Sequence, residues 1–336
     1  LLPHLPIRAP PFVIIRLGVT ILRKSLWLKA VLSTSLVLCA AGPATAQFGL
    51  RDLTRLAGAA GITAPNIRKE PITTSLADAQ WSDPSKDDFT PPEPKRQLSE
   101  LQRTSSGGFL LEPGYFTFHA QSYCLHAGTH GPGEGDGYLY APPLGPAKDA
   151  VIAIVRNSVQ HPEIEQRTIQ SLLWAILARA KVEDLSNDLK VAASQLLTPR
   201  QLAGLNRNVL DMLSRGPIAD NLPSELRQVL RAEADLRQML STPGTSYAQL
   251  EQVAVLAGLA PVGTGSMEVP ATRWSHHPDG YWIRYLPASY TNTVVEIWVP
   301  DEDSGAGEEY DPATHIAVPG NTARQRLMQS ARPYTS

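Results

Sequence analysis

Cysteine is scarce in this chain of 336 residues, which contains two, Cys39 and Cys124. Cys39 lies in an N-terminal segment that we expect to be removed during export, so the mature protein would keep one thiol and could not form a disulfide within the chain. An unpaired cysteine is unusual in an exported protein, because oxidising compartments normally use thiols in pairs. The Cys124 thiol therefore needs an explanation.

An excess of charge of one sign is also lacking. The chain has 30 Lys and Arg residues against 32 Asp and Glu residues, a formal net charge of −2, so the composition does not indicate the basic surface that nucleic acid requires. A membrane-spanning helix needs an apolar run of about 20 residues, but residues 12–22 are interrupted by Arg16 and no later run is long enough. We therefore expect a protein that neither binds nucleic acid nor spans a membrane.

The N-terminus has the pattern of an export signal. A basic region at 23–29 precedes an apolar stretch at 30–41, and Ala44-Thr45-Ala46 forms the small-x-small motif of a cleavage site. We interpret residues 1–46 as an over-extended start followed by a signal peptide. The mature protein is expected to begin at Gln47 and to be exported to the periplasm or the extracellular space.

The mature chain is predicted to combine strands and helices. Residues 47–108 are rich in proline and charge and have little to bury, so we expect them to be poorly ordered, apart from a short amphipathic helix at 50–62. Alternating or β-rich runs predict a hairpin or paired strands at 109–111 and 115–119 and further strands at 281–285 and 293–299. A helical period predicts two helices within 147–181. The expected fold class is α+β, with a mixed β region packed on the two helices.

A helical insertion is expected within this core. Thr198-Pro199, Pro223 and the capping box of Ser246 with Gln249 indicate the starts of three amphipathic helices. An oligomer contact through 198–258 is possible. The expected divisions are 47–108 as a poorly ordered Pro-rich segment, 109–182 as the strand and helix core with Cys124, 183–262 as an all-helical subdomain, and 263–336 as the β region that completes the core.

The C-terminal region contains two further local patterns. Residues 315–318 favour one more strand, and Gly320-Asn321-Thr322 favours the cap of a short helix that continues through Met328. The pair His276-His277, beside Pro278-Asp279-Gly280, indicates a solvated turn.

Several kinds of site could use Cys124. A buried structural role is one, since free cysteine packs as a small hydrophobe. A nucleophile activated by His119, His126 or His130 is another, because a thiolate beside an imidazole is reactive. A zinc site from Cys124, His126 and His130 is not expected, because these residues lie along a glycine-rich loop and zinc needs three or four rigidly held ligands. We expect no metal and no other cofactor.

One pattern resembles a known family. Tyr123-Cys124-Leu125 is followed by a glycine-rich loop, a helix, a His161-Pro162 turn and a second helix that bears Gln170-x-x-x-Trp174. Over about residues 121–181 this order resembles the thioester domains of bacterial surface adhesins, which carry a Tyr-Cys motif and a later Thr-Gln-x-Ala-Ile/Val-Trp motif. Ile169 and Leu172 stand where that family has threonine and alanine.

The resemblance implies that Cys124 attacks the side-chain carboxamide of a late glutamine and forms an internal thioester. Gln325, near apolar residues at 327–328, is the expected partner, and Gln329 is the second choice. A thioester survives only where water is excluded, which implies shielding by the tryptophan and tyrosine rings of the motifs and an orienting role for the motif glutamine. The residues expected to shape the site are Tyr123, His126, Gln170 and Trp174.

The leading functional hypothesis is an exported, soluble binding protein that acylates an amine on a protein or cell-surface partner. One alternative is an exported structural or assembly protein in which Cys124 is inert. A further alternative is an exported cysteine hydrolase. Of these, binding is favoured over enzymatic turnover, because the residues around Cys124 match no catalytic signature of a cysteine enzyme.

Signal peptide cleavage gives the first testable prediction. N-terminal sequencing of the exported protein should start at Gln47, because Ala44 and Ala46 provide the small side chains that signal peptidases require. An exported product that retained a lipid-bearing Cys39 would contradict both the localisation and the single-thiol argument.

Overall fold

The computed structural model describes residues 70–335, apart from 73, 81–83, 206–223 and 302–304. Runs rich in β-branched and aromatic residues form the longer strands, because these side chains suit a pleated backbone. The strands are β1 (Lys95–Gln97), β2 (Phe109–Leu110), β3 (Gly114–Cys124), β4 (Thr129–His130), β5 (Tyr138–Ala141), β6 (Val255–Leu256), β7 (Ser275–His276), β8 (Trp282–Ser289), β9 (Asn292–Val299), β10 (Glu309–Tyr310), β11 (Ile316–Pro319) and β12 (Leu327–Pro333).

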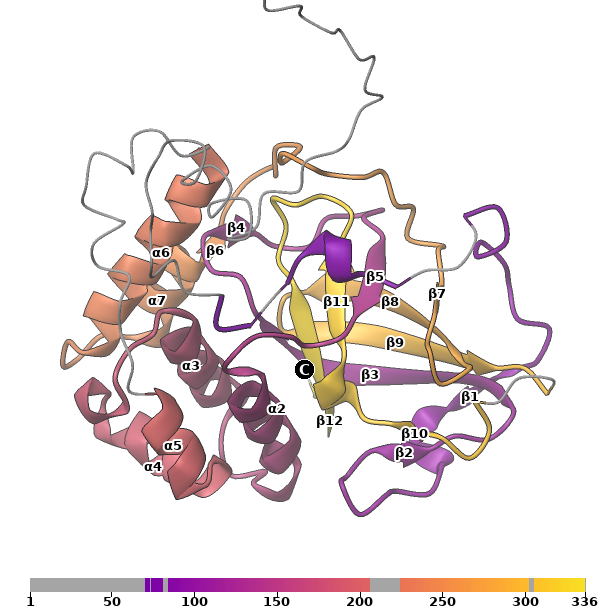
Figure 1. The fold of residues 1–336 in the computed structure, drawn as a ribbon, viewed down its shortest axis with the longest axis horizontal. Coiled ribbons are helices and arrows are strands. Elements are labelled where there is room, and N and C mark those ends of the chain that lie inside the picture. The colour runs from indigo at the N-terminus through magenta and orange to yellow at the C-terminus, as the bar shows by residue number, and fades with distance from the viewer. Residues whose placement is uncertain (1–69, 73, 81–83, 206–223, 302–304, 336) are drawn as a thin grey trace, which may run out of the picture. The chain divides into compact units, whose positions relative to one another are not determined.

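Six of these strands close into a barrel (Figure 1). β3 pairs with β9 on one side and β12 on the other, β12 continues to β11 and β5, and β5 pairs with β8, which returns to β9. Every pair in this ring is antiparallel. Outside the ring, β1 adds to β3 in parallel and β7 adds to β8.

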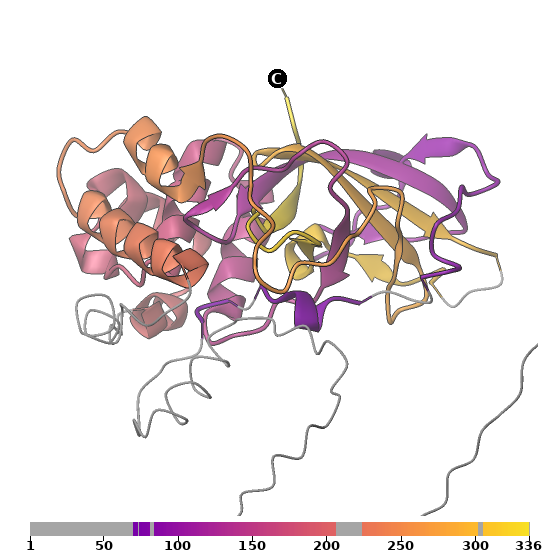
Figure 2. The same cartoon turned by 90° about the horizontal axis from the view of Figure 1, so that it is seen from above.

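The helices gather beside one end of the barrel (Figures 1 and 2). Helix α3 is their centre, because it contacts β3 as well as α2, α4, α6 and α7, and every side chain from Ile169 to Leu177 is buried. None of the helices in the described part of the chain is long and apolar enough to cross a membrane. The helices are α2 (Lys148–Asn157), α3 (Gln166–Leu177), α4 (Asn187–Leu196), α5 (Pro199–Leu205), α6 (Ser224–Leu240) and α7 (Tyr247–Ala254).

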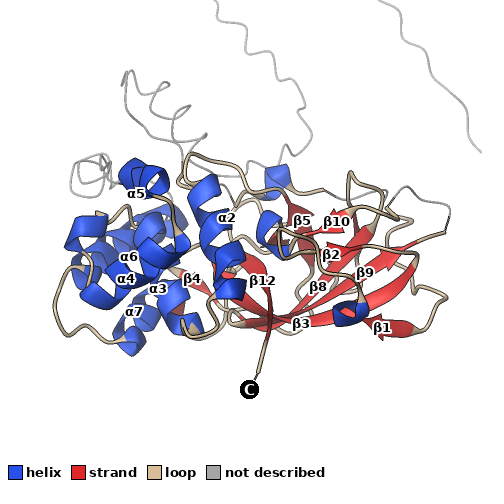
Figure 3. Cartoon of the chain, turned by 90° about the horizontal axis from the view of Figure 1, so that it is seen from below, coloured by secondary structure: helices blue, strands red, loops and turns tan. Residues whose placement is uncertain are grey.

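The α+β fold class is confirmed, but the arrangement of the sheet differs from the expected one. α3 contacts β3 and α2 contacts β12, yet the sheet also closes on itself, because the β8–β9 hairpin pairs back onto β3 (Figure 3). The buried side chains of the barrel and of the helices form one continuous hydrophobic cluster, with the helices on one side of the barrel (Figure 1).

The helical predictions for 198–258 are partly confirmed. The helices that start at Pro199, Ser224 and Tyr247 are present, and Ser246 and Gln249 form the expected capping box. Leu230 and Leu236 are buried, whereas residues 206–223 and the side chain of Leu226 lie outside the described residues. Helix α4 was not predicted as a separate element.

Two local predictions in the β region are wrong. Residues 109–111 do not form a hairpin with β3: β2 pairs with β10, and the backbone of Leu111 bonds to Glu308 and Gly307. The short helix expected through Met328 is instead the start of β12, since its backbone pairs with β3 and β11. In both places long-range pairing overrides a local preference.

The segment before β3 also contradicts its prediction in the part that is described. Phe89 stacks on Trp274 with ring centroids 5.3 Å apart, and the buried carboxylate of Asp87 accepts a hydrogen bond from Arg273 at 2.6 Å. β1 then extends the sheet. In the described part of 70–108, residues 87, 89 and 95–97 therefore pack on the barrel. Residues 47–69, with the helix expected at 50–62, lie outside the described residues.

A buried cluster of rings replaces the solvated turn expected at His276-His277. His277 stacks on Tyr281 with ring centroids 4.4 Å apart and lies 4.9 Å from the ring of His315. The Nδ1 of His315 lies 2.8 Å from the carbonyl of Asp311, so Nδ1 carries the proton and Nε2 accepts from the Tyr281 hydroxyl at 2.7 Å. Burial lowers the pKa of His277 to about 4 and that of His315 to about 3.

Acid should therefore destabilise the fold through these two histidines. Their folded pKa values lie below the unfolded value of about 6.5, so the unfolded chain takes up protons first and stability falls as the pH drops below about 6.5. Each ring should cost about 1.4 kcal/mol per pH unit until its folded pKa is reached. Denaturant unfolding at pH 7 and pH 5 measures this loss. His315→Gln should reduce the pH dependence of the unfolding free energy. The control variant His119→Gln, at an exposed position, should leave this pH dependence unchanged.

Candidate functional site

The Cys124 thiol lies against the side chain of Gln325. Cys124 ends β3 and is paired with Leu327 of β12, and Gln325 stands two residues before Leu327, just before β12 begins. The Sγ of Cys124 donates to the Oε1 of Gln325. Both side chains are 0% exposed. The fold thus brings together two residues 201 positions apart in the sequence.

The carboxamide of Gln325 is held in one orientation. Its Nε2 donates to the carbonyl of Thr129 at 2.8 Å and to the carbonyl of Ala254 at 3.1 Å. Because both amide protons are used by carbonyl acceptors, the oxygen side of the group must face Cys124. The backbone N–H of Gln325 is fixed as well, by the carbonyl of His130 at 2.8 Å.

Gln170 forms a two-way bridge to the backbone of Cys124. Its Oε1 accepts from the Cys124 N–H at 2.7 Å, and its Nε2 donates to the Cys124 carbonyl at 3.0 Å. The side chain therefore acts like one residue of an additional strand at the end of β3. Since Gln170 is buried in α3, the helix determines where the last residue of the strand lies.

Trp174 covers the same region from one helical turn further along α3. Its side chain is fully buried, and the ring of Tyr247 stacks on it with centroids 5.5 Å apart. Among the described residues, no acceptor lies at hydrogen-bond geometry from the indole Nε1, and the indole N–H lowers the pKa of Cys124 against the larger, raising effect of burial. Trp174 and Tyr247 thus form an aromatic cover over the thiol.

Tyr123 does not share this site. Neighbouring residues of a strand point to opposite faces, and the Tyr123 hydroxyl donates to Gln121 at 3.1 Å. Gln329 is also separate: it pairs with Ser122 rather than Cys124, and its buried amide has no hydrogen-bond partner among the described residues. The structure therefore brings Gln325, rather than Gln329, to the thiol.

The electrostatics around Cys124 do not favour a cysteine–histidine pair. Burial raises the pKa of Cys124 to about 11, against smaller lowering effects of Trp174 and the backbone of His126. The Nδ1 of His126 accepts a hydrogen bond from Arg326 at 3.1 Å, and burial with the Arg326 charge holds the pKa of His126 well below its usual value. His119 is exposed and bonds to Asn292.

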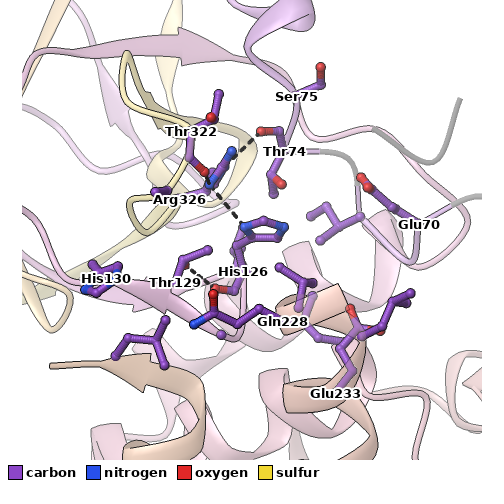
Figure 4. Close-up of a pocket in the computed structure, with 18 of the residues that line it drawn as sticks. Glu70, Thr74, Ser75, His126, Thr129, His130, Gln228, Glu233, Thr322 and Arg326 are labelled. Atoms are coloured by element: carbon purple, nitrogen blue, oxygen red, sulfur yellow. Dashed lines mark hydrogen bonds between the residues drawn. The ribbon is translucent and has the colours of Figure 1, made fainter. Parts of the chain in front are cut away.

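A cavity of about 120 Å³ lies beside the Cys124–Gln325 contact (Figure 4). Leu125 and His126, which follow the cysteine, line it, as does Arg326, which follows the glutamine. Helix α6 contributes a second wall, which includes Gln228 and Glu233. In the part of the chain that the structure describes, no group of three or more His, Cys, Asp or Glu side chains could hold a metal ion.

Some members of this site have no signal in the sequence. The carbonyls of Thr129 and Ala254 act through the backbone, so their residue types carry no information about the site. Tyr247 could have been noticed as an aromatic residue at the start of a capped helix, but its contact with Trp174 depends on how α7 packs on α3.

No protein-family model matches the chain. No match was found among curated proteins or among solved structures.

The Gln170 bridge gives a prediction for stability. Gln170→Leu keeps the approximate volume but leaves the N–H and carbonyl of Cys124 without their partner, which should cost about 2–4 kcal/mol of unfolding free energy. The neighbouring change Ser171→Ala is the control, because that hydroxyl bonds only to the carbonyl of Arg167 in its own helix. Urea unfolding of both variants measures the difference. Equal stability would show that the bridge does not anchor the end of β3.

Proposed function

We propose that this protein is an exported binding protein in which Cys124 and Gln325 form an internal thioester that acylates an amine on a partner. One observation carries the proposal: the thiol and the carboxamide are in contact, fully buried, and held from several sides. Backbone carbonyls that accept from the side-chain nitrogen would be enough to hold a purely structural buried glutamine. Such a residue would not need a thiol next to its side-chain oxygen.

The formation step is balanced within the two side chains. The Sγ of Cys124 attacks the Cδ of Gln325, a C–S bond forms, and the Cδ–Nε2 bond breaks. The nitrogen leaves as ammonia and takes the proton of the thiol. The raised pKa of Cys124 keeps that proton on the sulfur at neutral pH, so it is available to the leaving group.

The transfer step restores the thiol. An amine of the partner attacks the same carbon, the C–S bond breaks, and the Gln325 side chain becomes a secondary amide of the partner. The sulfur of Cys124 takes up the proton that the amine loses. Before this step, burial beneath Trp174 and Tyr247 protects the thioester from hydrolysis by keeping water away.

We assign the helical insertion at 183–262 a part in this site. The last residue of α7, Ala254, provides one of the two carbonyls that hold Gln325, and Tyr247 of the same helix covers Trp174. If the insertion served only as an oligomer contact, it would not need to contact the glutamine. The protein or cell-surface partner would approach from outside this cover.

A structural role for Cys124 is the second candidate. Its complete burial and raised pKa are also what an inert core thiol would have. The two roles differ in a measurable way, because an inert cysteine keeps its thiol and its glutamine keeps its nitrogen. A cysteine hydrolase is disfavoured, since His126 is bonded to Arg326 and the thiol does not reach solvent.

Intact mass tests the proposal. The mature protein should weigh one ammonia less than its sequence requires, and the loss should disappear in Cys124→Ala and in Gln325→Ala. Gln329→Ala is the matched control and should keep the loss, because Gln329 does not contact the thiol. Cyclisation of an N-terminal Gln47 also releases ammonia, so peptide mapping must assign the loss to a Cys124–Gln325 cross-link.

A second readout uses a small primary amine. Methylamine added under denaturing conditions should become attached to Gln325 and free the thiol of Cys124 for alkylation. A protein of full mass whose Cys124 is alkylated stoichiometrically on unfolding, with no amine incorporated, would contradict the thioester and support the inert thiol.

A further inference from the structure

Arg326 is a buried cation without an ion-pair partner. Its side chain is 5% exposed, and within the described residues no carboxylate lies at salt-bridge distance from it. Its Nη1 donates to the carbonyls of Thr322 and Arg324, both at 2.6 Å, and its Nε donates to the carbonyl of Thr74 at 3.3 Å. Buried charges are normally paired, so this guanidinium, which is held by backbone carbonyls, is suited to bind an anionic ligand.

The cavity lies where that anion would bind. Arg326 lines it, and its hydrogen bonds within the described residues use Nε and Nη1, not Nη2. His126 accepts a further hydrogen bond from this guanidinium. An arginine nitrogen cannot accept a hydrogen bond, so the Nδ1 of His126 must be the acceptor in their contact and its proton must lie on Nε2. Figure 4 shows the His126 ring inside the cavity, with one edge directed at Arg326.

Apolar side chains form much of the remaining wall. A cavity of about 120 Å³ is close in size to cavities that hold a six-membered hydrocarbon ring, so it admits a small organic molecule rather than a single water. Donors at one end and an aliphatic surface elsewhere suit a short carbon chain with an acidic head. The apolar wall consists of Ile72, Leu76, Leu125, Val229, Leu230 and Leu256.

We infer that this cavity is a binding site for a small aliphatic carboxylate, with its head on Arg326 and its chain against α6, Ile72 and Leu76. The site is separate from the proposed thioester, because Cys124 and Gln325 do not line the cavity. It requires no covalent step.

Two acidic residues also line the cavity, and neither prevents this binding. Glu233 is paired with Arg179 at 3.3 Å, and burial raises the pKa of Glu233 to about 7, so much of it is neutral at neutral pH. The charge of Glu70 raises the pKa of Arg326, but burial has the larger effect and lowers that pKa to about 10. The guanidinium of Arg326 therefore stays charged, and nearby carboxylates compensate its positive charge poorly. In Figure 4 both carboxylates lie on the side of the His126 ring away from Arg326.

Thermal unfolding with matched four-carbon probes tests this inference. Butanoate at 10 mM, compared with chloride at equal ionic strength, should raise the Tm of the mature protein by about 2–4 °C. Butanamide has the same shape without the charge, and butan-1-amine has the opposite charge, so neither should raise it. Protection by butanamide or the amine equal to that by butanoate would overturn the assignment of a carboxylate, and so would no protection by butanoate.

A pair of variants locates the binding. Thr264→Trp places a large ring at the rim of the cavity and should abolish the butanoate effect. Val262→Trp changes a residue that is 83% exposed and does not line the cavity, and it should keep the effect. Both positions are at the surface, so both variants should fold, unlike changes at buried Arg326. A full butanoate effect in Thr264→Trp would show that the anion binds elsewhere. The result is independent of the thioester, which is read from mass.

Discussion

The register between β3 and β12 is the constraint on which the candidate site depends. Cys124 is paired with Leu327, and the segment just before β12 stays beside the end of β3, because Leu125 donates to the carbonyl of Arg326 and Gln325 to that of His130. A slip of one residue would turn the glutamine to the opposite face. Closure of the barrel makes such a slip costly, because β12 is also paired with β11 and β3 with β9. The contact between these distant residues is thus positioned by backbone hydrogen bonds.

Helix α3 adds the second part of this positioning. Gln170 and Trp174 are four residues apart, so they lie on the same side of the helix. The first binds the backbone of Cys124, and the second covers the region of its side chain. A bridge to a backbone, unlike one to a side chain, leaves the thiol itself free to contact Gln325. Strand order and helix packing therefore define the site together.

The sequence predicted more of this site than of the fold around it. The periodic pattern of 147–181 was sufficient for both helices, and the motif residues led to Cys124, Gln170 and Gln325. The element that carries the glutamine was predicted incorrectly, since Gly320-Asn321-Thr322 and the residues after it favour a capped helix locally. Pairing with β3 and β11 overrides that preference. Barrel closure could not be inferred from the sequence, because it depends on which strands pair with one another, and the local pattern of each strand does not specify its partners.

The closed ring also limits how this chain can associate with others. A strand with unpaired N–H and carbonyl groups is a template for adding a strand from another molecule. In the described part of the chain, the ring strands have partners on both sides, and the strands added outside it, β1 and β7, have three and two residues. Edges this short offer few backbone bonds to an incoming chain. Association by strand exchange is therefore disfavoured, and the helical side is left as the broader surface for self-recognition.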